Sequence, residues 1–85
     1  MERYTQKNDR SITVDPERME EALARLAAFE DMAEDLQREQ VTIAQTLEDL
    51  RSRGKDRTVQ FKELLARKLV NNNMKLLLER YGIKL

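Results

Sequence analysis

A heptad repeat of apolar residues is the feature that most constrains the fold of this chain. Steps of three and four residues from Met19 to Leu50 pass through ten positions, and nine of them are apolar although only 40% of the chain is apolar. Such a repeat places its members on one face of an α-helix. We call these positions the seam: Met19, Ala22, Leu26, Phe29, Ala33, Leu36, Gln40, Ile43, Leu47 and Leu50. A buried amide at Gln40, the one polar member, can set the register of a helical pairing.

Helix-boundary residues predict one long helix and a shorter helical return, an all-α helical hairpin or small bundle. Asp15 suits an N-cap and Pro16 the first helical turn, whereas Gly54 suits the end of a helix. The chain therefore divides into an N-terminal extension over residues 1–14, a long acidic amphipathic helix over 15–53 and a basic helical return over 54–85.

The return is expected to begin at a cap formed by Asp56 or Thr58 and to be broken by the triplet Asn71–Asn73, because asparagine side chains compete for backbone hydrogen bonds. A last short helix, Met74–Tyr81, would then end at Gly82. The apolar residues of this helix lie on almost all of its sides, which predicts that it is buried on more than one side.

The N-terminal extension has a different pattern. Arg3–Gln6 and Ser11–Val14 are joined by the polar stretch Lys7–Arg10, which predicts a small β-hairpin. An isolated two-stranded ribbon is marginal in water, so this hairpin must dock or remain mobile.

Length predicts that part of the seam has no partner within the chain. At about 1.5 Å per residue, the first helix would span roughly 54 Å and the return about 36 Å at most. The N-terminal end of the seam therefore stays uncovered, and exposed apolar stripes usually mark interfaces. We expect a homodimer or a hetero-complex, with the oligomer interface at Met19, Leu23, Leu26 and Phe29.

Charge is divided between the two halves of the chain. Residues 15–50 carry a net charge of −8 and residues 51–85 a net charge of +7. The acidic side chains lie mainly at outer heptad positions. One interpretation is a solvated helix face, and the other is an acidic ridge that binds a basic protein surface. The candidate partner-binding residues of this acidic ridge are Glu20, Glu21, Asp31, Glu34 and Asp35.

Four cations cluster where the long helix is expected to end. This basic turn comprises Arg51, Arg53, Lys55 and Arg57. Cations at a helix C-terminus are favourable in any protein, which is the simpler interpretation. The alternative is a phosphate-binding surface with salt-dependent affinity for nucleic acid.

Composition excludes most catalytic chemistry. The chain has no His and no Cys, so His-based triads, thiolate nucleophiles and the usual zinc ligands are missing. We predict no catalytic residues, no metal site and no cofactor, and therefore not an enzyme. No apolar run approaches the roughly 20 residues of a membrane span, so we expect a cytoplasmic protein without membrane contact.

Two stretches resemble a group of known proteins. The opening Met1–Thr5 (MERYT) and the segment Leu26–Asp31 (LAAFED) are similar to small prophage-type accessory proteins of Gram-positive bacteria, which carry MERLT and LAxYED. Gly54–Ala66 and the ending Tyr81–Ile83 look like other short proteins of such genomes. The resemblance implies a small inhibitor of a host or defence protein.

These observations lead to two hypotheses of function. The first is a noncatalytic protein-binding module, an inhibitor that occludes a partner surface through its acidic helix. The alternative is a small nucleic-acid-binding protein that uses the basic turn and the C-terminal half.

Overall fold

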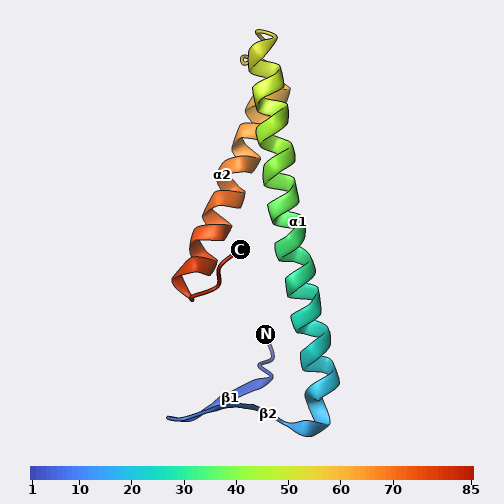
Figure 1. The fold of residues 1–85 in the computed structure, drawn as a ribbon, viewed down its shortest axis with the longest axis vertical. Helices are drawn as coiled ribbons and strands as arrows, with labels where there is room; N and C mark the ends of the chain where they lie inside the picture. The colour runs from blue at the N-terminus through green and yellow to red at the C-terminus, as the bar shows by residue number, and fades with distance from the viewer. The chain divides into compact units, whose positions relative to one another are not determined.

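The computed structural model describes residues 1–85 and is mostly helical. Its elements are β1 (Thr5–Lys7), β2 (Ile12–Val14), a 3-10 turn (Pro16–Arg18), α1 (Met19–Ser52) and α2 (Val59–Arg80) (Figure 1). The chain forms two units, residues 1–32 and 33–85, and α1 contributes to both. The predicted long helix, shorter helical return and N-terminal hairpin are thus all present.

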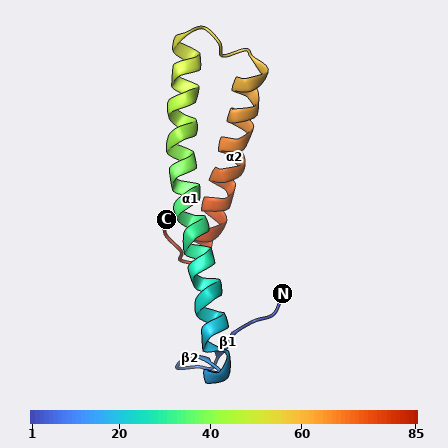
Figure 2. The same cartoon turned by 90° about the vertical axis from the view of Figure 1, so that its right-hand side faces the viewer.

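Within residues 33–85, the second part of α1 and α2 lie side by side as a helical hairpin (Figure 2). Gly54 adopts a φ of 70°, in the left-handed region that favours glycine, and ends α1 as expected. Its N–H donates to the Arg51 carbonyl at 3.1 Å, and the Lys55 N–H donates to the Leu50 carbonyl at 2.7 Å. Thr58 then caps α2 by accepting from the Phe61 N–H at 3.2 Å.

The core of this hairpin comes from the C-terminal half of the seam. Ile43, Leu47 and Leu50 form one buried cluster with Phe61 of α2, and Leu64 packs against it. Leu36 is also buried. Seam positions at this end of α1 therefore have the partner that the heptad pattern requires.

The predicted break at Asn71–Asn73 is wrong, because α2 continues through the triplet. Asn71 is buried and donates to Gln40 Oε1 at 3.2 Å, while Gln40 Nε2 donates to Asn72 Oδ1 at 2.8 Å. Asn71 also donates to Glu39 at 3.3 Å, and Arg67 donates to the same carboxylate. These amides have partners on α1, so they do not compete for the backbone of their own helix.

The expected burial of the last turns of α2 on several sides is also wrong. Met74, Leu76 and Leu77 are exposed, and only Leu78 is half-buried. The one helix beside α2 is α1, which covers a single face of α2. Asn71 lies on that covered face. Gly82, with a φ of 78°, follows the end of the helix as predicted.

Within residues 1–32, β1 and β2 pair antiparallel in the register Thr5↔Val14, Gln6↔Thr13 and Lys7↔Ile12. The Asn8 side chain holds the turn, because its Oδ1 accepts from the backbone N–H groups of Arg10 and Ser11, both at 2.9 Å. Asp15 then caps the first helical turn by accepting from the Glu17 N–H at 3.0 Å. The hairpin is docked on α1 rather than free, through contacts described next.

Candidate protein-binding surfaces

An apolar hollow of about 680 Å³ lies between the hairpin and the first turns of α1. All four residues predicted as the oligomer interface line it, together with Ala22 of the seam. The hairpin side contributes Tyr4 and Val14 among others. The structure thus brings the N-terminal end of the seam and the hairpin together around one surface, which we call the apolar hollow.

The floor of the apolar hollow is open to solvent. Leu23 is 56% exposed and Leu26 is 53% exposed, although both are large aliphatic side chains. Met19 is also exposed, whereas Ala22 and Phe29 are half-buried. This surface suits apolar side chains of a binding partner, because each such contact removes apolar area from water.

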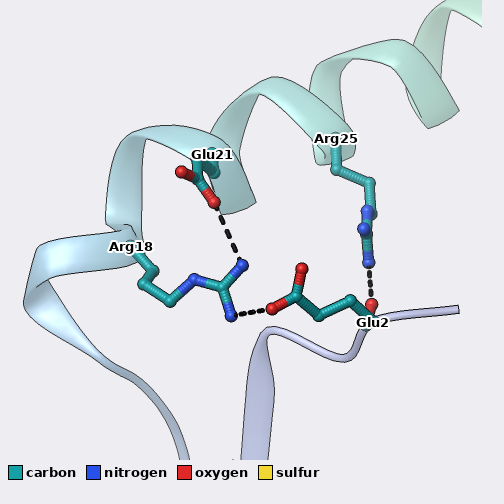
Figure 3. Close-up of polar contacts among 4 residues, drawn as sticks. All are labelled: Glu2, Arg18, Glu21 and Arg25. Atoms are coloured by element: carbon teal, nitrogen blue, oxygen red, sulfur yellow. Dashed lines mark hydrogen bonds and ion pairs between the residues drawn. The ribbon is translucent and has the colours of Figure 1, made fainter.

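Two arginines of the helical segment fix the Tyr4 wall of the apolar hollow. The Arg25 guanidinium carbon lies 4.0 Å from the centroid of the Tyr4 ring, and that of Arg18 lies 4.5 Å from it. Both distances are within the range of cation–π attraction. Arg25 Nη1 also donates to the Glu2 backbone carbonyl at 2.5 Å (Figure 3). The N-terminal segment is therefore held on α1 by backbone and side-chain contacts together.

Ion pairs complete this attachment. Arg18 bridges the carboxylates of Glu2, at 2.5 Å, and Glu21, at 3.1 Å (Figure 3). The hydrogen bond from Arg18 and its positive charge lower the pKa of Glu2 below its ordinary value. The two carboxylates in turn raise the pKa of Arg18. Because the carboxylates of Glu2 and Glu21 are exposed, the pairs orient the segment more than they stabilise it.

The structure distributes the acidic ridge unevenly. Within residues 1–32, Glu20 and Asp31 are exposed without an ion pair, whereas Glu21 pairs with Arg18. Within residues 33–85, Arg38 pairs with Glu34 at 3.8 Å and with Asp35 at 2.9 Å. Part of the predicted negative charge is therefore balanced locally, and Glu20 and Asp31 remain the free carboxylates of the set.

The basic turn is also partly balanced. Arg51 pairs with Glu48 at 3.4 Å and lies over the Phe61 ring at 5.5 Å, while Arg53 pairs with Asp49 at 2.8 Å. Lys55 and Arg57 are exposed without a carboxylate partner. Two of the four cations of the predicted phosphate-binding surface, Arg51 and Arg53, thus already pair with carboxylates in the last turns of α1.

Several surface residues were missed by sequence reasoning. Tyr4 and Val14 line the apolar hollow, and Arg18 and Arg25 hold Tyr4 in place, yet none belongs to the seam. An isolated aromatic residue at the start of a polar extension was the available signal for Tyr4. A smaller hollow of about 280 Å³ within residues 33–85 is lined by Gln40, Asn71 and Asn72 among others, and it is more polar.

No group of His, Cys, Asp and Glu side chains is arranged to hold a metal ion. Neither α1 nor α2 combines the length and apolarity needed to cross a bilayer. No family model, no curated protein sequence and no solved structure matches this chain.

Proposed function

We propose that this chain is a noncatalytic protein-binding module and that the apolar hollow is its contact surface. The observation that carries the proposal is the convergence of Leu23, Leu26 and Phe29 with Tyr4 on one solvent-open apolar surface. Tyrosine is one of the residue types that supply most of the binding energy in protein interfaces, and covering the apolar side chains around it removes apolar area from water.

The surroundings of the apolar hollow support binding rather than catalysis. Its floor is apolar, and both arginines that line it are engaged: Arg3 donates to the Thr5 carbonyl, and Arg25 contacts Tyr4 and the Glu2 carbonyl. General acid–base chemistry requires a titratable group positioned at a reacting atom. The apolar hollow presents no carboxylate for such a role.

The resemblance to prophage-type accessory proteins suggests a specific form of this function. We propose an inhibitor that occludes a surface of a host or defence protein. The free carboxylates Glu20 and Asp31 would steer it towards a basic partner, because complementary charge mainly raises the association rate.

Affinity capture with matched variants tests this proposal. The tagged chain is incubated with a lysate of Gram-positive bacteria, and bound proteins are identified by mass spectrometry. The double variant Leu23→Ser/Leu26→Ser is expected to lose the captured partner. Val41→Ser is the control, because Val41 is exposed to a similar degree, 58%, outside the apolar hollow. Equal capture by the double variant and the wild type would reject the apolar hollow as the contact surface.

A charge-reversal variant tests the acidic ridge separately. Asp31→Lys/Glu34→Lys/Asp35→Lys is expected to abolish capture of a basic partner while α1 stays helical, since exposed charges contribute little to stability. Circular dichroism checks the helix. Unchanged capture would leave these carboxylates as a solvated helix face.

The competing hypothesis, nucleic-acid binding by the basic turn, has its own readout. Lys55 and Arg57 are the cations free to contact phosphates. A titration of duplex and single-stranded DNA at several salt concentrations distinguishes the two functions. Submicromolar affinity that falls steeply with salt would favour nucleic-acid binding over the proposed function.

A further inference from the structure

The N-terminal end of the seam has a heptad pattern but no helix packed on it within its own unit. In residues 1–32, Met19 and Leu26 occupy equivalent heptad positions, and both are exposed. One occupant that fits an apolar heptad seam is another helix with the same repeat. A second copy of this chain carries that repeat.

Two charges border this part of the seam on opposite edges. Arg25 directly precedes Leu26, and Glu30 directly follows Phe29. Residues at these two edge positions, five apart in sequence, meet across a parallel, in-register pair of helices. Arg25 of each copy would then face Glu30 of the other copy, giving two opposite-charge pairs by symmetry.

An antiparallel pair would bring like edges together instead. Arg25 would then lie near the corresponding arginine edge of the second copy, which also holds Arg18, and the Glu30 edges would meet each other. Like charges facing each other across an interface are unfavourable and are a common means of selecting one orientation. The charge pattern therefore favours the parallel arrangement.

Both charged groups are available for this contact. Glu30 is exposed and has no ion pair within the chain. Arg25 donates to the Glu2 carbonyl through one nitrogen, Nη1, and a guanidinium has five N–H donors. The remaining donors of Arg25 make no hydrogen bond within the chain and are free for a carboxylate of the second copy.

We propose that the apolar hollow is a homodimer interface in which residues 19–30 of two copies pack parallel and in register. This inference rests on the proposed protein-binding function and names the partner as a second copy. The paired segment covers only about 18 Å of helix. Tyr4 and Val14 enlarge the apolar contact beyond the two helices, so the docked hairpin is part of the interface.

Disulfide trapping tests the register, because the chain contains no cysteine of its own. Met19→Cys and Leu26→Cys each place one thiol on the seam, about 10 Å apart along the helix. In a parallel, in-register dimer, both variants form interchain disulfides on mild oxidation, since each thiol faces its equivalent within bonding distance. In an antiparallel dimer, at most one of these two positions lies opposite the same position of the second copy. Ala24→Cys, on the outer face of α1, is the control and should stay monomeric on a non-reducing gel.

Charge-reversal variants test the proposed pairing of Arg25 with Glu30 of the second copy. Sedimentation equilibrium should show a dimer for the wild type and a dissociation constant raised by about tenfold for Glu30→Lys, because both opposite-charge pairs become repulsive. Arg25→Glu alone should weaken the dimer as well. An equimolar mixture of these two variants restores both pairs, so a heterodimer that is tighter than either homodimer is expected. Absence of this rescue would overturn the parallel register.

The failure of this inference can be distinguished from the failure of the proposed function. A monomeric wild-type chain that still captures another protein through Leu23 and Leu26 would reject the second copy and retain protein binding. A monomer that captures nothing would reject both.

Discussion

The two units of this molecule use the same heptad seam in different ways. In residues 33–85, α2 covers the seam, and Leu47 and Leu50 are 3% and 2% exposed. In residues 1–32, a two-stranded hairpin lies beside the seam, and Leu26 remains more than half exposed. The same apolar periodicity thus forms a core in one unit and an open surface in the other.

This difference shows that periodicity specifies a helix face but not its partner. The helix α2 contributes Phe61 and Leu64, which pack against the seam residues Ile43, Leu47 and Leu50. The hairpin has strands of only three residues and is attached chiefly through Tyr4 and the N-terminal segment. It therefore forms one wall of a surface and leaves the floor open.

The largest expected effect contrasts leucines from the two units. Leu47→Ala should lower the free energy of unfolding by about 2–5 kcal/mol, because it leaves a cavity in a buried cluster. Leu26→Ala should cost about 0.5 kcal/mol or less in dilute protein, as expected of an exposed position. Urea unfolding followed by far-UV circular dichroism measures both. Equal losses in dilute solution would show that the two parts of the seam are equally buried.

The second prediction concerns the polar layer of residues 33–85. Asn71→Leu should destabilise the helical hairpin by about 1–3 kcal/mol, because Gln40 Oε1 then loses its donor in a part-buried setting. The double variant Gln40→Leu/Asn71→Leu should recover part of this loss, since the unpaired Gln40 Oε1 is removed as well, while Asn72 Oδ1 loses its donor. Thermal melts of the single and double variants measure the coupling. Additive losses would contradict a direct interaction between the two amides.

The smallest expected effect is the pH dependence of the hairpin attachment in residues 1–32. The pKa of Glu2 is lowered in the folded chain, so its ion pair with Arg18 stabilises the attachment above the unfolded pKa of about 4.5. This contribution is lost as the pH falls through the folded pKa. In a Tyr81→Phe background Tyr4 is the sole tyrosine, and the chain has no tryptophan. Its fluorescence should therefore report release of the segment in acid.

Glu2→Gln is the matched variant for that measurement. It should weaken the attachment at neutral pH and remove the acid transition, because the amide neither titrates nor pairs with Arg18. An acid transition of unchanged midpoint in Glu2→Gln would assign the effect to another group.

Local residues made much of this fold predictable. Gly54, Thr58, Asp15 and Gly82 act as the helix boundaries that their types indicate, because capping and left-handed turns depend on neighbouring backbone groups alone. The long helix, the return and the N-terminal hairpin follow from these signals and from the apolar periods. The residues predicted as an oligomer interface, Met19, Leu23, Leu26 and Phe29, follow from the apolar period and the length of the return; they line one hollow, and their role in oligomerisation stays a prediction.

Other features depended on contacts between distant segments. The composition of Asn71–Asn73 predicts a helix break. Gln40 and Glu39 instead accept hydrogen bonds from the Asn71 side chain, and α2 continues through the triplet. Tyr4 gave no sequence signal for lying between Arg18 and Arg25. Pairing of Arg38 with the carboxylates of Glu34 and Asp35 was likewise not anticipated, and it reduces the free charge of the acidic ridge.

The sequence by itself determined the outer boundaries of α1 and α2 and which face of α1 is apolar, but not that α2 continues through Asn71–Asn73. Those properties arise from backbone capping and side-chain period, which act within a few residues. Only the tertiary structure decided that α2 buries Leu36, Ile43, Leu47 and Leu50 while Leu23 and Leu26 stay open beside Tyr4. Burial depends on which distant segment supplies the opposing surface, and a period along one helix carries no information about that segment.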